Sequence, residues 1–195
     1  MTRLPGLRPN ELDDDQRRLY DAIAGGDRAK DASFPLTDDD GALIGPFNPL
    51  LYSPTVGDAV QRLGGALRFN CGLGAAVREM AILAVATHHH CEFERWAHER
   101  IALRVGLSMG QVAALRDGSR PDFDSDEFNA AYDLIVATLS GITPDGHMYD
   151  AAVQQLGTEG IFELVAVVGY YAMLAQMMTV FKIGVPEDPA ATPTG

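Results

Sequence analysis

The sequence predicts an all-α fold, a helical bundle formed by one domain. Apolar residues recur at the three- and four-residue spacing of amphipathic helices, and glycine, proline and serine fall between these periodic segments. No stretch shows the alternating pattern of a half-buried strand. A chain of 195 residues is long enough for one buried core and too short for two comfortable domains, so residues 1–195 are expected to form a single domain.

The first helix is expected over residues 10–24. Three aspartates at 13–15 place negative charge in its first turn, and two glycines at 25–26 end it. Residues 27–49 are rich in Asp, Gly and Pro and lack periodicity, which indicates a long connection. Within it, the segment 45–49 (Gly-Pro-Phe-Asn-Pro) is not expected to form the interior of a helix, because proline lacks the backbone N–H.

Three helices are expected in the middle of the chain. Ser53 followed by Pro54 is typical of a helix start, and this helix should run through Leu67 before two glycines break the chain. The next helix, at about 75–88, is apolar nearly all round and must therefore lie in the core. The third covers about 91–105 and stops at a glycine.

Four more helices are expected in the last part of the chain, at about 108–118, 126–139, 147–156 and 158–181. The tail from Pro186 is rich in Pro and Ala and is expected to be loose. Residues 164–181 carry no charge and are nearly long enough to span a membrane. Gln176 in the interior, tyrosines in mid-segment and few basic flanking residues argue against insertion, so this helix is expected to be buried on all sides.

Composition and charge exclude several classes of protein. The formal net charge is -12, so a polyanion would meet a repulsive field, and nucleic acid is not expected as a partner. Cys71 and Cys91 are the two cysteines, which excludes a disulfide scaffold and a cysteine-rich zinc site. Residues 1–12 contain no apolar run that could serve as a secretory signal. We expect a cytoplasmic protein that does not associate with a membrane.

The helix at 91–105 carries the most informative pattern. At about 100 degrees per residue, Cys91, Glu94 and His98 fall within one narrow arc, and apolar residues continue that arc toward the end of the helix. Burying a carboxylate and an imidazole costs several kcal/mol unless they are paired. Glu79 lies on the apolar side of the preceding helix. The sequence therefore predicts a buried polar cluster that includes Glu79, Glu94 and His98.

Four segments carry a resemblance to a known family: Pro46-Phe-Asn-Pro-Leu-Leu-Tyr-Ser-Pro, Arg78-Glu79, Cys91-Glu-Phe-Glu-Arg-Trp-Ala-His98 and Gly106-Leu-Ser. Together they resemble the carboxymuconolactone decarboxylase family, which includes the alkylhydroperoxidase-D-like proteins. The resemblance covers a core of about 46–118, and the last helix resembles the longer members. It implies an all-helical fold that assembles into trimers or hexamers, with the site near subunit contacts.

The resemblance also assigns positions. The peroxidase branch of the family uses a glutamate, a Cys-x-x-Cys pair and a histidine, and spacing carries these onto Glu79, Cys91, Glu94 and His98. Glu94 stands where the second cysteine would be, which removes the dithiol. A lone thiol beside a carboxylate has its pKa raised, which weakens the nucleophile. The decarboxylase branch also lacks the dithiol, so the sequence lies nearer to that branch.

The leading hypothesis is a decarboxylase-like lyase that uses acid–base chemistry, without a cofactor, on a small carboxylated lactone or a related intermediate of aromatic degradation. His98 would be the general acid or base, and Glu79 or Glu94 would orient and tune it. The remaining candidate residues are Cys91 in the catalytic set and Arg78, Arg95 and His90 as contacts to the substrate.

Other interpretations stay open at this point. The protein could be a one-cysteine peroxidase centred on Cys91, or a non-catalytic oligomeric protein that binds small molecules. His90, Glu94 and His98 stand four residues apart and could bind zinc if one continuous helix carried all three. Since the chain must turn near residues 88–91, no metal is expected. His98 also has a structural interpretation, as a core histidine bonded to Glu79 or Glu94.

Overall fold

The computed structural model describes residues 2–26, 29 and 34–186. In chain order, the described elements are η1 (Pro9–Glu11), α1 (Asp14–Ala24), α3 (Phe47–Leu50), α4 (Pro54–Phe69), α5 (Ala75–His88), α6 (Glu92–Arg104), α7 (Met109–Asp117), α8 (Asp126–Leu139) and α9 (Gly146–Phe181). Apart from one isolated bridge between Thr37 and Leu43, the described residues form no β-structure. The predicted all-α class is confirmed.

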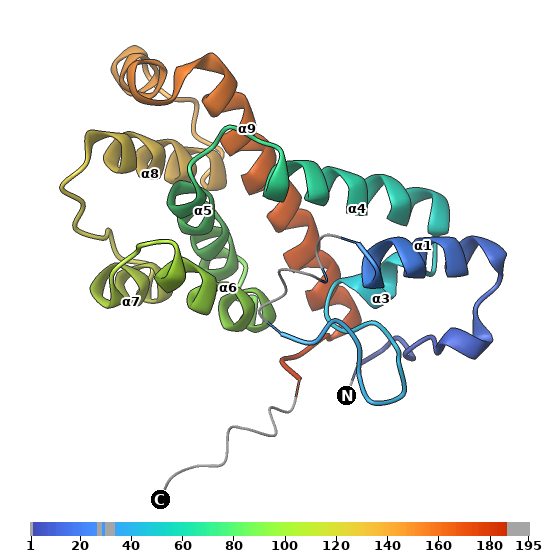
Figure 1. Cartoon of the computed structure of the whole chain (residues 1–195). Coiled ribbons are helices and arrows are strands. Elements are labelled where there is room, and N and C mark those ends of the chain that lie inside the picture. Colours follow the sequence, from blue (N-terminus) through green and yellow to red (C-terminus); the bar gives the residue numbers. More distant parts are fainter. Residues whose placement is uncertain (1, 27–28, 30–33, 187–195) are drawn as a thin grey trace, which may run out of the picture.

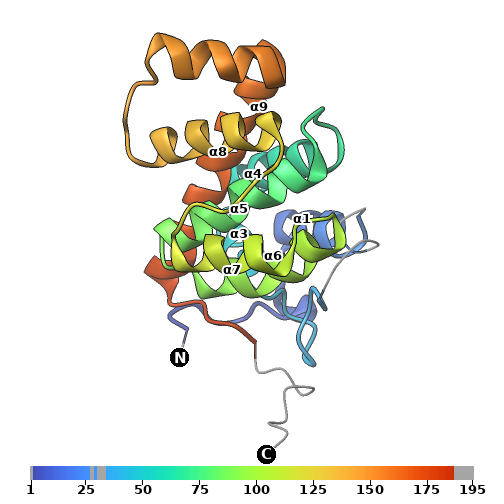
Figure 2. The same cartoon turned by 90° about the vertical axis from the view of Figure 1, so that its left-hand side faces the viewer.

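The long helix α9 runs through the middle of the molecule (Figure 1). On one side of it lie α5, α6, α7 and α8, and on the other lie α1, α3 and α4. Figure 2 shows α7 and α8 on the near side of the first group, with the N-terminal part of α9 above α8. Helix α5 packs against α6, α7, α8 and α9, so it lies at the centre of the larger group, as its apolar sequence requires.

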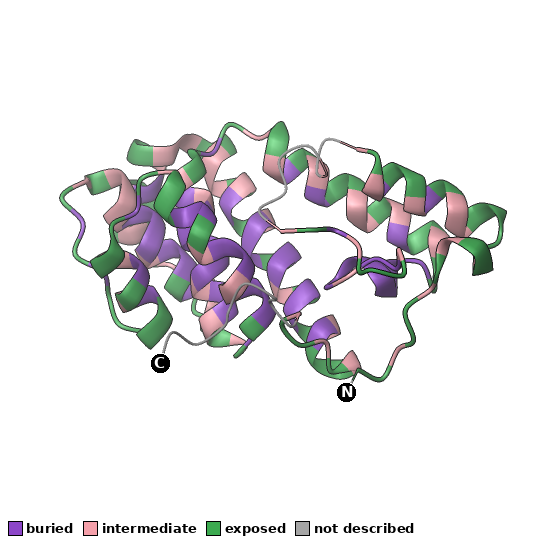
Figure 3. Ribbon diagram, turned by 60° about the horizontal axis from the view of Figure 1, so that its bottom comes forward, coloured by how far each residue is buried: buried purple, intermediate pink, exposed green. Residues whose placement is uncertain are grey.

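The core has two parts. The larger one surrounds α5 and α9, and the smaller one joins α1, α3 and the connection before α3. Phe34, Val60 and Met177 pack against both parts and link them. Figure 3 shows buried residues on the inner faces of the helices, and all four residues of α3 are buried.

Most helix boundaries agree with the predicted ones, and α5 and α8 agree residue for residue. The first helix begins later than predicted, because Asp13 accepts a hydrogen bond from the Gln16 backbone N–H and caps α1 there. As predicted, segment 45–49 does not form the interior of a helix. Residues Phe47–Leu50 form a helical turn that includes Pro49, and proline is tolerated there because the first turn of a helix leaves its N–H groups unpaired.

Helix α9 differs from the prediction in two ways. The two helices expected at 147–156 and 158–181 form one element interrupted at Gly157, whose φ of 69° is non-helical. The expectation that the second part is buried on all sides was wrong, because Val165, Met173 and Val180 are 42%, 40% and 58% exposed. By length and composition alone, α9 is the one described helix that could cross a membrane. In the tail expected to be loose, residues 187–195 lie outside the described part of the chain.

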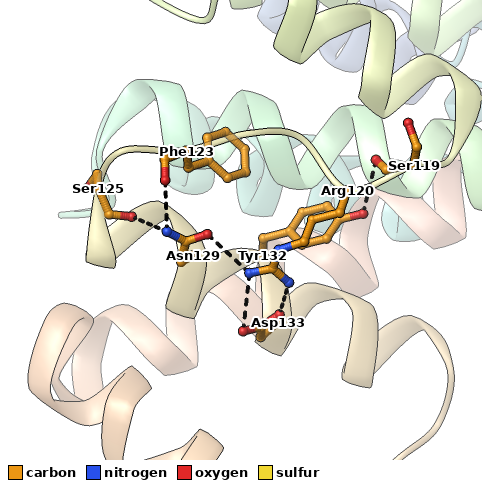
Figure 4. A network of polar contacts seen from close by, with 7 residues as sticks. All are labelled: Ser119, Arg120, Phe123, Ser125, Asn129, Tyr132 and Asp133. Atoms are coloured by element: carbon orange, nitrogen blue, oxygen red, sulfur yellow. Dashed lines mark hydrogen bonds and ion pairs between the residues drawn. The ribbon is translucent and has the colours of Figure 1, made fainter.

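A polar network fastens the linker between α7 and α8 to α8 (Figure 4). The Arg120 guanidinium pairs with Asp133, donates to Asn129 Oδ1 at 3.1 Å and lies over the Tyr132 ring. The Tyr132 hydroxyl donates to the Ser119 carbonyl at 3.3 Å. The network therefore fixes the path of this linker against α8.

Candidate functional site

The site is built on α5 and α6, which pack side by side after a tight turn. His90 lies in that turn with a φ of 53°, in the left-handed region that reverses the chain within three residues. Across the two helices, His98 Nδ1 lies 2.7 Å from Glu79 Oε2. The residues are 8% and 2% exposed, so this hydrogen bond is buried. The sequence left the partner of His98 open between Glu79 and Glu94, and the structure pairs it with Glu79.

Glu94 is also buried, at 2% exposure, but has no such partner. Neither of its carboxyl oxygens accepts or donates a hydrogen bond among the described residues. The contact with His98 that one helical turn would allow is therefore not made. Burial raises the pKa of Glu94 to about 9, because the low-dielectric interior disfavours the charged form. At neutral pH this side chain is a neutral carboxylic acid.

Glu94 and His98 line a pocket of about 550 Å³, its open mouth included. Glu79 does not line it and lies behind His98. The other lining residues come from α3, α4, α6, α9 and the connection before α3, and are mostly apolar: Phe34, Leu36, Pro46, Phe47, Arg68, Phe93, Ala97, Ile101, Tyr170, Tyr171 and Leu174. A mostly apolar pocket with a few convergent polar groups is the usual form of a small-molecule site.

Aromatic rings form two walls of this pocket. The His98 ring packs edge-to-face on Tyr171, with 5.2 Å between the ring centroids. On the other wall, the rings of Phe34 and Phe93 meet edge-to-face at 5.5 Å. Gly45 makes the second wall possible: its φ is 60°, and a Cβ there would lie 2.2 Å from the Phe93 ring.

Cys91 lies outside the pocket, at the N-cap position of α6. It is 5% exposed, and burial together with the nearby Glu94 raises the pKa of its thiol to about 11. The thiolate is therefore scarce at neutral pH, and the thiol packs as a small apolar group.

The three side chains predicted to contact substrate do not reach the pocket. Arg78 points toward the loop before α5, where Nη1 contacts the Leu73 carbonyl at 3.4 Å. Arg95 follows Glu94 directly, and adjacent residues of a helix point about 100 degrees apart. His90 is exposed in the turn before α6. Since α6 begins at Glu92, the face that would have joined His90, Glu94 and His98 does not exist.

Arg68 and Tyr171 are among the lining residues that the sequence did not mark as part of a site. Arg68 is in the last turn of α4, where a basic residue is ordinarily explained by the helix dipole, so nothing marked it as part of a site. Tyr171 was assigned to the core. It is buried, but it also lines the pocket and contacts His98. Among the described residues, no group of three or more His, Cys, Asp or Glu side chains could hold a metal ion.

A family model matches part of the chain. Residues 54–137 match the model of the carboxymuconolactone decarboxylase family. The chain therefore resembles this family over the segment from α4 to α8. The match contains the helices that carry Arg68, Glu79, Glu94 and His98. No match was found among curated protein sequences.

Solved structures show the same fold at low sequence identity. A peroxidase-related protein from Ralstonia eutropha with an alkylhydroperoxidase AhpD core has a TM-score of 0.73 at 17% identity, covering 95% of this chain and 93% of that one. A putative antioxidant defence protein AhpD from Agrobacterium tumefaciens has a TM-score of 0.64 at 15% identity, covering 72% of this chain and 97% of that one. A variant of the debrominase Bmp8 in complex with 2,3,4-tribromopyrrole has a TM-score of 0.69 at 13% identity, covering 95% of this chain and 91% of that one. These similarities establish an AhpD-like fold and leave the activity open.

The raised pKa of Glu94 predicts an unusual dependence of stability on pH. In the folded protein Glu94 keeps its proton up to about pH 9, whereas a free glutamate has a pKa of 4.5, so between these values the unfolded state binds fewer protons. The free energy of unfolding should therefore fall as pH rises. From pH 5 to 8 the contribution of Glu94 is up to about 4 kcal/mol.

This contribution can be isolated by urea denaturation at pH 5 and pH 8. Glu94→Gln should remove the pH-dependent contribution of Glu94. The stability of this variant relative to the wild type should therefore be greater at pH 8 than at pH 5. Glu92→Gln, on the same helix but exposed, should follow the wild type. An identical pH dependence in wild type and Glu94→Gln would show that Glu94 is ionised in the folded protein.

Proposed function

We propose that the protein is a cofactor-independent, decarboxylase-like enzyme that performs acid–base chemistry on a small carboxylated lactone or a related intermediate of aromatic degradation. One observation carries the proposal: His98, held by Glu79, and a protonated Glu94 line the same apolar pocket. Two titratable groups whose environments differ in this way are suited to separate acid and base roles.

His98 is the group that exchanges protons with the substrate. The Glu79 carboxylate accepts a hydrogen bond from the His98 Nδ1–H. This bond fixes the tautomer of the His98 ring and leaves Nε2 as its basic nitrogen. Glu79 also stabilises the imidazolium that forms when His98 is protonated. Because Glu79 lies behind His98, it acts as a positioning residue.

Glu94 supplies a neutral donor. When the bond to the departing carboxylate breaks, carbon dioxide leaves and the electron pair passes into the conjugated lactone carbonyl. The protonated Glu94 carboxyl donates a hydrogen bond to the oxygen that gains this charge. The His98 imidazolium then delivers a proton to the carbon and is reprotonated from solvent. The apolar walls favour this step because the charge concentrated on the carboxylate spreads over the larger enolate.

Arg68 selects a substrate with a second carboxylate. It lies on the pocket wall, and a guanidinium binds a carboxylate through paired hydrogen bonds. Arg68 therefore holds a carboxylate that the reaction leaves in place. In this role it replaces Arg78 and Arg95, which the sequence suggested.

We also propose that the chain acts as a homo-oligomer, a trimer or hexamer as its resemblance to the family implies. Large apolar side chains that remain exposed on the chain support association: they include Val56, Leu63, Phe69, Val136, Phe162 and Val180.

The acid–base role predicts a large kinetic effect at His98. His98→Gln should lower kcat by on the order of 100- to 10,000-fold, because proton transfer from a positioned group contributes that much. The assay is carbon dioxide release from a panel of carboxylated lactones, with melting curves of the same samples. Glu79→Gln should also lower kcat, because His98 loses the hydrogen bond that orients it, whereas the exposed Glu92→Gln should leave kcat unchanged. Full turnover by a folded His98→Gln would refute the proposed chemistry.

Arg68 should determine affinity for the substrate. Arg68→Met is expected to raise KM by about 10- to 100-fold with a smaller change in kcat, because a hydrogen bond to a charged group is lost. Arg95→Met provides the matched control, since Arg95 is half-exposed outside the pocket. Equal effects of the two substitutions would exclude Arg68 as the carboxylate contact.

Thiol chemistry should be dispensable. Because Cys91 is buried and its thiol has a raised pKa, the wild type should consume hydrogen peroxide negligibly in the presence of a dithiol. Cys91→Ser should retain the decarboxylase-like activity. Rapid thiol-dependent peroxide consumption that is lost in Cys91→Ser would instead favour the peroxidase interpretation.

A further inference from the structure

Residues 34–46, which precede α3, form one wall of the pocket, and we call this segment the strap. Phe34 and Leu36 at its start and Pro46 at its end line the pocket. Between these ends the strap turns back on itself, and the Ile44 backbone N–H donates to the Leu36 carbonyl at 3.0 Å. The two ends of the strap are therefore held together at the pocket by its own backbone.

The tip of the strap is fastened away from the pocket. The Tyr20 hydroxyl of α1 donates to the Gly41 carbonyl at 2.8 Å. Asp38 Oδ1 accepts hydrogen bonds from the backbone N–H groups of Asp40 and Ala42, at 3.0 and 2.9 Å. None of these five residues lines the pocket. A pocket-lining residue of the strap can therefore be changed while the contacts that hold the tip remain.

The ring of Phe34 has a defined position against α6. Its centroid lies 5.5 Å from that of Phe93 in an edge-to-face contact, and 5.0 Å from that of Trp96 with the planes tilted by 48°. Aromatic rings favour edge-to-face contact at such distances. Phe93 is buried and Phe34 is half-buried, so the Phe34 ring forms the outer end of this aromatic wall.

Phe34 and Leu36 also line a second hollow. This hollow measures about 970 Å³ with its opening to solvent included, and its other lining residues come from α1 and the chain around Phe34: Tyr20, Ala24, Ala29, Pro35 and Thr37. Neither Glu94 nor His98 lines it. A side chain that lines two hollows stands between them. Leu36 is buried in the smaller part of the core, so the half-buried Phe34 ring is the outer part of this partition.

We infer that Phe34 determines which ligands the pocket accepts, because its ring limits how far a ligand can extend from Glu94 and His98 toward the second hollow. The inference deepens the proposed function and rests on it, since it takes the pocket to be the substrate site. Its consequence is a limit on size. A carboxylate on a single planar ring fits between the aromatic walls, and a carboxylate on two fused rings meets the Phe34 ring.

Removal of the Phe34 ring should join the two hollows. A large-to-small substitution leaves a cavity, because the surrounding structure relaxes only in part. The strap is bonded across its ends and fastened at its tip, so it should keep its path in Phe34→Ala. The second ring of a longer ligand can then occupy the space that Phe34 fills in the wild type.

Isothermal titration calorimetry with benzoate and 2-naphthoate tests the inference, because these carboxylates differ by one fused ring. The wild type should bind benzoate about tenfold more tightly than 2-naphthoate, since a clash with the wall rejects the longer ligand. Phe34→Ala should remove this preference by gaining affinity for 2-naphthoate. Phe34→Leu, which keeps an apolar side chain against Phe93, should be intermediate and serves if Phe34→Ala fails to fold. The control Tyr149→Ala, which removes a 46% exposed ring outside the pocket, should bind both as the wild type does.

The outcomes separate this inference from the proposed chemistry. A wild type that binds neither carboxylate, or binds both equally, would overturn the inference, as would an unchanged preference in both folded Phe34 variants. A size limit that depends on Phe34 in a protein without lactone turnover would refute the proposed function alone. Turnover of carboxylated lactones by a protein whose ligand preference ignores Phe34 would refute the inference alone.

Discussion

The hydrogen bond between Glu79 and His98 is the constraint on which the site depends. Glu79 is 2% exposed, and a charged carboxylate buried to that extent requires a partner, which here is His98 of the neighbouring helix α6. This requirement fixes how far α6 lies along α5. The short turn between α5 and α6, with His90 in the left-handed region, brings His98 to Glu79. In this arrangement Glu94 and His98 of α6 line the pocket, and Cys91, which precedes α6, lies in the core.

The two buried glutamates show how position alone separates two roles. Glu79 is paired with His98, whereas the Glu94 carboxyl has no hydrogen-bond partner among the described residues and retains its proton because it is buried. One fold thus presents a supported imidazole and a neutral carboxylic acid within the same pocket, without a metal ligand set among the described residues. The unpaired Glu94 reduces stability above its ordinary pKa, and such a cost is typical of groups kept for function.

The sequence predicted the helices and the buried face of α6, because both follow from local periodicity. It predicted that Glu79, Glu94 and His98 are buried, since a single helical arc and the apolar surroundings of Glu79 are enough for that. It could not choose between Glu79 and Glu94 as the partner of His98, because that choice depends on how two helices pack. Arg68 was missed for the same reason: it lines the pocket from α4, a different helix from the one that carries Glu94 and His98, and no local pattern signals such a contact.

The position of Glu94 connects the chemistry with the family. By its resemblance to the peroxidase branch, Glu94 stands where that branch has the second cysteine of its pair. A cysteine thiol and a protonated carboxyl group are both neutral proton donors. A glutamate in place of the second cysteine therefore removes the dithiol that redox chemistry needs. It still places a proton donor one helical turn from His98. Burial is what makes the exchange possible, because an ionised glutamate would place an unpaired charge in an apolar pocket. Cys91 packs in the core at the start of α6.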